Sequence, residues 1–170
     1  MKKITALLLA AIMVLASVSA LAAGSPTAQG VSVYVPMTPA GAHFEVGELG
    51  TTGAAYQTAV QNGENPYTDE TKATLDEMFP DGYSTYDIVG LKISGAVEGE
   101  GAEVELEFAT EYKAGTPVAA VLVVVNGETA SESVLKAEVK EDYVVTVTFP
   151  ADVLMAAQTA EECFLAIVAK

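Results

Sequence analysis

The feature that most constrains this chain is an uninterrupted apolar run from Pro117 to Val125, with turn signals on both sides. Gly115-Thr116 precede the run and Asn126-Gly127 follow it. A half-exposed strand would alternate apolar and polar residues, so this run predicts a strand covered on both faces by other strands or a helix. It is too short to cross a bilayer, which takes a helix of about 20 residues. We interpret it as the central strand of a β-sandwich.

From Tyr86 onward, short apolar segments alternate with turn signals, a pattern typical of an all-β sandwich or barrel. The segment from Glu103 to Phe108 alternates strictly, which places three carboxylates on one face and apolar side chains on the other. Asn126-Gly127 predicts a tight hairpin, and Ser133-Val134-Leu135 breaks the alternation and predicts a bulge. Further strands are expected at 31–35, 43–49, 130–139 and 143–149, and a last buried strand at 163–168.

Two helices are expected. The clearer one runs from Asp69 to Phe79, with Thr68 as its N-cap and acidic residues in its first turn. Its apolar stripe of Leu75, Met78 and Phe79 must dock on the sheet, because so short a helix is marginal by itself in water. A second, short helix is expected at 151–158 after Pro150, before the last strand. Residues 50–63 suit a helix or a strand equally, and both alternatives stay open.

The N-terminus has the layout of a secretory signal peptide. Met1-Lys2-Lys3 precede an apolar stretch from Ile4 to Val18, and small residues follow, so cleavage is expected after Ala22. The alternative is an uncleaved membrane anchor. We therefore divide the chain into a signal peptide (1–22), a leader with a strand and helix region (23–85) and a β-sandwich domain (86–170). The mature protein is expected to be secreted or on the cell surface, with no integral membrane segment.

The charge of the chain restricts its partners. Cleavage would leave 148 residues, and the formal net charge would change from −15 to −17, because two of the eight basic residues leave and all 23 acidic residues stay. Arginine, the side chain best suited to phosphate recognition, is absent from the sequence. Nucleic acid and anionic membrane surfaces are therefore poor partners, and we expect an extracellular protein or a glycan.

No catalytic or cofactor-binding residue is assigned from the sequence. His43 is the only histidine and Cys163 the only cysteine, so one zinc site of Cys and His ligands cannot be assembled. Neither residue has the sequence context of a catalytic triad. Cys163 stands at the start of an apolar segment, which favours a buried thiol over pairing with another chain. No cofactor is expected.

Carboxylates are the remaining candidates for chemistry. Asn62-Gly63-Glu64-Asn65, Asp69-Glu70 and Asp81-Gly82 offer oxygen ligands for calcium, but they lack the EF-hand pattern, and helix capping and turn formation explain them better. Glu103, Glu105 and Glu107 share one strand face at a spacing of about 6.6 to 7 Å. Such a pair could serve glycoside hydrolysis. An exposed, self-repelling face that protects a strand from aggregation is the favoured interpretation, so no metal or catalytic site is assigned.

The strand pattern resembles a known module. The residues that carry the resemblance are 104–108, 112–115, the apolar strand ending in Asn126-Gly127-Glu128, 134–139, 145–154 and 164–168. Together they are similar to small exported proteins of gut Firmicutes, a functionally uncharacterised family. The resemblance covers about Asn65 to Lys170, and it implies an immunoglobulin-like antiparallel β-sandwich from a bacterium without implying a catalytic motif.

The sequence thus predicts a mainly β protein that works as a non-catalytic interaction or structural module, because the chain lacks an assembled active site. Two alternatives stay open: a calcium-dependent adhesion or carbohydrate-binding domain, and an extracellular hydrolase that uses carboxylates.

Overall fold

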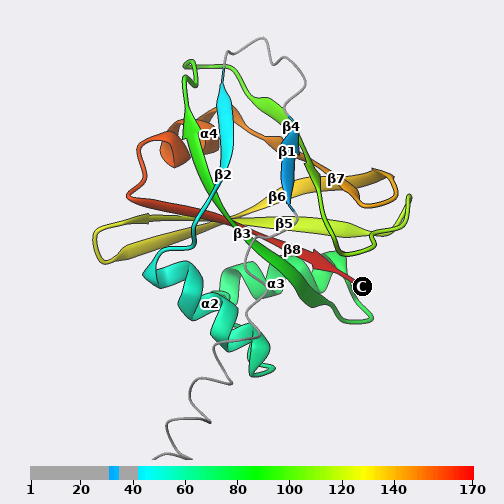
Figure 1. Cartoon of the computed structure of the whole chain (residues 1–170). Helices are drawn as coiled ribbons and strands as arrows, with labels where there is room; N and C mark the ends of the chain where they lie inside the picture. The colour runs from blue at the N-terminus through cyan, green and yellow to red at the C-terminus, as the bar shows by residue number, and fades with distance from the viewer. Residues whose placement is uncertain (1–30, 35–41) are drawn as a thin grey trace, which may run out of the picture.

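One antiparallel sheet of eight strands forms the frame of the protein (Figure 1). The computed structural model describes residues 31–34 and 42–170, so the predicted signal peptide lies outside the described residues. The strands are arranged in the order β1-β4-β7-β6-β5-β8-β3-β2. The elements are β1 (Ser32–Tyr34), β2 (His43–Gly47), α2 (Thr51–Gln61), α3 (Asp69–Met78), β3 (Ser84–Ser94), β4 (Ala102–Glu107), β5 (Val118–Asn126), β6 (Thr129–Glu141), β7 (Val144–Phe149), α4 (Ala151–Gln158) and β8 (Glu162–Ala169).

The sheet curls into a half-barrel, and two strands that change partners along their length produce the stagger that curling requires. The first part of β6, Thr129 to Lys136, pairs with β5, whereas Ala137 to Glu141 pairs with β7. In the same way β3 pairs first with β8 and then, from Gly90 onward, with β2. The edge strands β1 and β2 approach each other across the open side.

The prediction of a mainly β protein is confirmed, but the predicted immunoglobulin-like sandwich is not. The strands form one curled sheet instead of two stacked ones. Alternation and turn signals locate strands in a sequence, but they do not reveal that β6 is long enough to belong to both halves of the sheet. The described residues also form two helices before β3 where one was expected, because the ambiguous segment 50–63 contains α2. The short helix expected at 151–158 is confirmed as α4.

Strand β5 is buried on both faces, as its apolar run predicts. One face lines the inner core of the half-barrel and the other lines an outer core beneath α2 and α3, which cover this side of the sheet (Figure 1). The inner face carries Val118, Ala120, Leu122 and Val124, and the outer face carries Ala119, Val121, Val123 and Val125. The predicted central strand is therefore correct, although its cover is strands on one side and helices on the other.

Helix α3 docks on this outer core through part of its predicted stripe. Thr68 is the N-cap, and its side chain accepts a hydrogen bond from the backbone N–H of Thr71, as expected. Leu75 and Phe79 are buried, but Met78 is 45% exposed, so its placement on the stripe was wrong. The helix ends at Met78, and Phe79 leaves helical geometry with φ −127°. This change of direction brings Phe79 into the core and leaves Met78 outside.

The predicted hairpin forms between β5 and β6, with its turn shifted by one residue. Asn126 pairs with Thr129, so the turn residues are Gly127 and Glu128. Gly127 has φ +61°, which a turn with positive φ at its first central position requires.

The bulge predicted at 133–135 is wrong, because pairing with β5 continues without a shift through these residues. Val134 contacts the outer core and Leu135 lies in the inner one, so apolar cover on both faces explains the broken alternation. The irregularity lies instead between Val139 and Glu141, in the part of β6 that pairs with β7.

Among the described residues, no helix has both the length and the apolar character needed to cross a membrane.

The two-sided burial of β5 makes a direct prediction for stability. Replacement of Leu122 by Ala should lower the free energy of unfolding by about 2 to 5 kcal/mol, because the side chain is fully buried in the inner core. The measurement is urea unfolding followed by circular dichroism. Val97→Ala is the control, because Val97 is 50% exposed and its truncation should change stability by about 0.5 kcal/mol or less. Equal losses of unfolding free energy in both variants would contradict the burial of Leu122 in the inner core.

Candidate functional site

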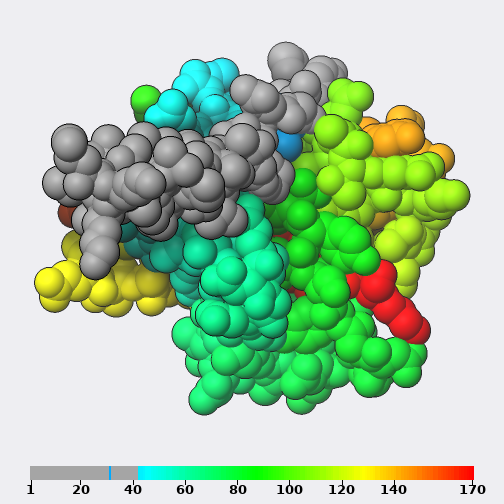
Figure 2. All heavy atoms as spheres, turned by 60° about the horizontal axis from the view of Figure 1, so that its bottom comes forward, coloured from blue at the N-terminus to red at the C-terminus, as the bar shows by residue number. Residues whose placement is uncertain are grey.

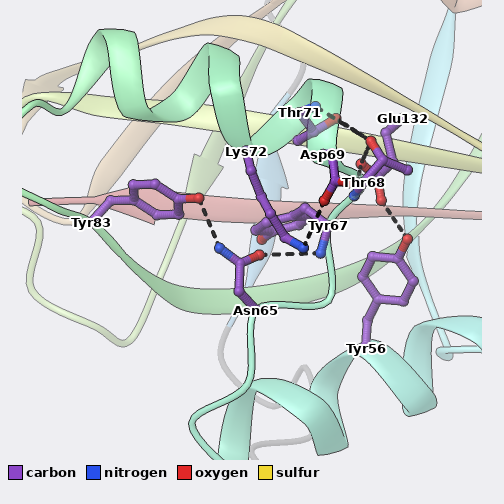
Figure 3. A network of polar contacts seen from close by, with 9 residues as sticks. All are labelled: Tyr56, Asn65, Tyr67, Thr68, Asp69, Thr71, Lys72, Tyr83 and Glu132. Carbon is purple, nitrogen blue, oxygen red and sulfur yellow. Dashed lines mark hydrogen bonds and ion pairs between the residues drawn. The ribbon is translucent and has the colours of Figure 1, made fainter.

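The carboxylate of Glu132 connects the sheet to both helices that cover it (Figure 3). Glu132 lies on β6, opposite Val123 of β5. Its Oε1 accepts a hydrogen bond from the Tyr56 hydroxyl of α2 at 2.5 Å. Its Oε2 accepts hydrogen bonds from the backbone N–H of Thr68 at 3.0 Å and from the Thr68 hydroxyl at 2.8 Å. One side chain therefore fixes the positions of α2 and of the N-terminus of α3.

This network holds Glu132 in its charged form. Partial burial raises the pKa of the Glu132 carboxyl, but hydrogen bonds from Thr71, Tyr56 and Thr68 outweigh burial, so the pKa is lowered overall. Burial and the contact with Glu132 raise the pKa of the Tyr56 hydroxyl. Tyr56 therefore remains the proton donor, and Glu132 the acceptor, across the neutral range.

A second glutamate, Glu162 of β8, caps the other helix. Its Oε2 accepts from the backbone N–H of Thr52 at 3.1 Å and its Oε1 accepts from that of Gly53 at 2.7 Å. These donors belong to the first turn of α2, where the helix dipole favours a negative charge. A Cβ at residue 53 would lie 2.8 Å from Leu49 Cδ2 and 3.0 Å from Glu162 Oε1. An alanine at residue 53 would therefore require the ends of the Leu49 and Glu162 side chains to move away from the helix.

The loop between the two helices is fixed by polar contacts of Asn65 and Tyr67 (Figure 3). Asn65 Nδ2 donates to the Tyr83 hydroxyl at 2.8 Å, and Asn65 Oδ1 accepts from the backbone N–H of Tyr67 at 3.2 Å. The Tyr67 ring is buried, and its hydroxyl lies 2.8 Å from Thr85 Oγ1 on β3. Tyr67 therefore packs in the outer core and fixes the loop to β3.

A groove with both polar and apolar walls lies between α3 and β6, directly beside the Glu132 network. Its volume is about 490 Å³, which lies in the range of small-ligand clefts. We call it the α3–β6 groove. Its walls combine hydroxyl and carboxylate groups with apolar surface: the lining residues are Thr68, Glu70, Thr71, Thr74, Ala130, Ser131, Glu132 and Val134. It can accept hydrogen-bond donors and positive charge.

The groove runs along a strand edge that is unpaired in the part of the chain that the structure describes. Residues Thr129 to Lys136 of β6 pair with β5 on one side, and β7 begins to pair only at Ala137. We call Thr129–Lys136 the free edge. The hairpin that carries it projects beyond the helical layer, as its yellow atoms show in Figure 2. Alternate residues of such an edge direct their backbone N–H and C=O groups outward.

A second cleft, of about 380 Å³, lies beyond the start of β8 and next to α4. Cys163 lies in its lining and is only 8% exposed, so the predicted burial of this thiol is confirmed. Burial, with a smaller contribution from Glu162, raises the pKa of the Cys163 thiol to about 12. The thiol is therefore protonated at neutral pH, and it lacks the thiolate that a nucleophile needs.

The other residues considered in the sequence lie apart from the groove. His43 is exposed on β2, where its Nε2 lies 3.2 Å from Glu45 Oε1. Glu103, Glu105 and Glu107 alternate along β4 with buried apolar residues, which confirms their common outer face. They lie opposite Thr148, Thr146 and Val144 of β7.

Two of the carboxylates considered for calcium are occupied by lysines. Asp69 pairs with Lys72 at 3.5 Å, and Asp81 pairs with Lys170 at 2.5 Å. Within residues 31–34 and 42–170, no three His, Cys, Asp or Glu side chains form a group that could hold a metal ion.

The sequence pattern predicts the N-cap Thr68 but not the capping contacts of Glu132 and Glu162. A threonine before an acidic turn is a local signal, whereas each glutamate acts on backbone groups more than 60 positions away in the chain. The available hint is that Glu162 borders an otherwise apolar strand and so must face polar groups.

Comparisons with known protein families, with curated proteins and with solved structures found no match. Function is therefore inferred from the contacts and the free surfaces of the chain itself.

The lowered pKa of Glu132 predicts a pH-dependent stability. A carboxyl whose pKa is lower in the folded state stabilises the fold above its unfolded pKa, and this stabilisation is lost as pH falls through the folded pKa. Replacement of Glu132 by Gln should therefore lower stability at pH 7 and flatten the loss of stability below about pH 4.3. Urea unfolding at a series of pH values measures both effects. Glu128→Gln, in the exposed hairpin turn, is the matched control. An unchanged pH slope in the Glu132 variant would contradict the role of the network.

The Glu162 cap predicts that replacing a helical glycine by alanine lowers stability, which is the opposite of the usual effect. Alanine normally favours a helix over glycine by about 1 kcal/mol. Gly53→Ala should nevertheless lower the melting temperature, because its Cβ would displace the Glu162 carboxylate from the helix N-terminus. Thr58→Ala, exposed on the same helix, should change it little. A higher melting temperature for Gly53→Ala would show that the close approach is not required.

Proposed function

We propose that this chain is an exported, non-catalytic interaction module that binds an extracellular protein or glycan. The observation that carries the proposal is the free edge of β6 beside the α3–β6 groove. Paired strands satisfy the backbone groups of a sheet interior, whereas an unpaired strand offers them to another molecule. Export is itself a prediction from residues 1–22, and the resemblance to exported proteins of gut Firmicutes, over about Asn65 to Lys170, implies the same address.

The surroundings of the free edge support a binding role. A recognition surface works best on elements whose side chains are already held in place, because little conformational entropy is then lost on binding. Strand β5 anchors the free edge from its buried side. Glu132 holds the opposite wall of the groove through Thr68. The groove is therefore shaped before any ligand arrives.

The proposal is tested by binding measurements with the mature chain, residues 23–170. The immobilised protein is exposed to a glycan array and to extracellular extract, and each retained ligand is purified and titrated back. Saturable binding of one defined ligand, recovered unchanged, is the expected result. Conversion of a glycan by the protein, lost when Glu103 or Glu105 is replaced by Gln, would instead establish a hydrolase. Calcium dependence is tested separately, because an ion bound to the folded state raises the melting temperature.

A further inference from the structure

We propose that the free edge of β6 binds an extended, basic segment of a partner protein as an added β-strand. This inference rests on the proposed function and names the class of partner. Three features support it: the regularity of the free edge, the groove that follows it, and the distribution of charge.

The free edge has few of the devices by which proteins protect exposed strands. Edges are commonly blocked by proline, by bulges or by lysines that point outward. Residues Thr129 to Lys136 include no proline, and their pairing with β5 has no register shift. Their one lysine, Lys136, is engaged by Glu138 at 2.7 Å. A regular edge of this length can accept the backbone of an extended segment along its whole course.

The α3–β6 groove would receive side chains of the added strand. On the outer face of the sheet, β6 presents Ala130, Glu132 and Val134, and all three line the groove. An added strand places every second side chain on that same face. Those side chains would lie beside α3, within reach of the Thr71 and Thr74 hydroxyls and of the Glu70 carboxylate. The groove therefore offers hydrogen-bonding and charged partners to the side chains at alternate positions of the added strand.

The charge of the site favours a basic segment. Glu70 and Glu132 are part of the groove, and Glu128 lies in the adjacent turn. The nearest lysine on α3, Lys72, is paired with Asp69 at 3.5 Å. A lysine or arginine on the added strand would meet these carboxylates without a competing cation from α3. The whole chain, with a formal net charge of −15, would also attract a cation from a distance.

The same charge argues against a second copy of this chain as the occupant. Two copies would bring two strongly acidic molecules together, which costs free energy at each approach. A two-fold pairing of the free edges centred on Glu132 would also place the two Glu132 carboxylates opposite each other, and like charges in that position are destabilising. A basic partner removes both costs.

The test uses labelled synthetic peptides and the full mature chain. The probe is a peptide of about eight residues in which lysine alternates with valine, long enough to span the free edge. Its controls are an acidic peptide with Glu for Lys and a basic peptide with a central proline. Two further probes carry N-methyl groups on alternate residues, one on the odd and one on the even positions. Binding is measured by fluorescence anisotropy at low and at physiological salt.

Strand addition predicts a specific pattern of binding results. The basic peptide should bind, the acidic and proline peptides should bind at least about tenfold more weakly, and only one of the two N-methylated probes should lose binding, because only one edge of the added strand pairs with β6. Backbone amides within Thr129–Lys136 should exchange hydrogen more slowly in the complex. Affinity should fall with salt, because exposed charges are screened.

A matched pair of variants tests whether the carboxylates of the groove, and not the net charge of the protein, attract the basic peptide. Glu70→Lys should weaken binding by about fivefold, whereas Glu107→Lys, the same change on the outer face of β4, should have a smaller effect. Equal effects would mean that only net charge matters, and the proposal would fail. It would also fail if the proline peptide bound as well as the alternating one, or if both N-methylated probes bound unchanged. If the protein sediments as a dimer and the amides of the free edge exchange slowly in that dimer, the occupant of the free edge is a second copy of this chain. If every peptide fails while a purified ligand binds elsewhere, the interaction function stands and this partner class does not.

Discussion

Burial of β5 on both faces is the constraint on which the rest of the structure depends. Val118 to Val125 carries no polar side chain, so each face of the strand must be covered by apolar surface. The curled sheet covers one face and the helical layer covers the other. The outer core on which the helices dock continues from β5 onto Ile88 of β3 and onto Phe164, Ala166 and Val168 of β8. Because α3 is short, its stability comes from this contact and not from helix propensity alone.

The two capping glutamates convert that apolar contact into a defined arrangement. Apolar packing has little directionality, so by itself it would let the helices slide over the outer core. Glu132 and Glu162 point from the sheet to the first turns of α3 and α2, where unpaired backbone N–H groups need acceptors. Each helix is thus held at its N-terminus by a charge from a different strand. The α3–β6 groove owes its shape to the first of these contacts.

The free edge is a consequence of the way in which the sheet curls. Strand β6 leaves β5 after Lys136 and pairs with β7 from Ala137, so its first part has a neighbour on one side only. The same exchange of partners in β3 leaves a gap next to α4, where the second cleft lies. Both hollows beside the sheet therefore arise where a long strand changes partners. The α3–β6 groove differs from the second cleft because it follows a regular strand edge.

Local patterns in the sequence were sufficient for the strands, for the N-cap Thr68 and for helix α4, because these depend on residues close together in the chain. They were also sufficient for the burial of Cys163 and the outer face of Glu103, Glu105 and Glu107. They could not distinguish a sandwich from a half-barrel, since strand pairing joins residues far apart. The ambiguous segment 50–63 contains α2, which packs on the outer core and is capped by Glu162, more than 100 positions away. The sequence by itself determined where the strands, α3 and α4 lie and that β5 is buried on both faces, through periodicity and turn chemistry. Only the tertiary structure decided which strands pair, which carboxylates cap helices and which edge stays free, because those outcomes depend on contacts between distant segments.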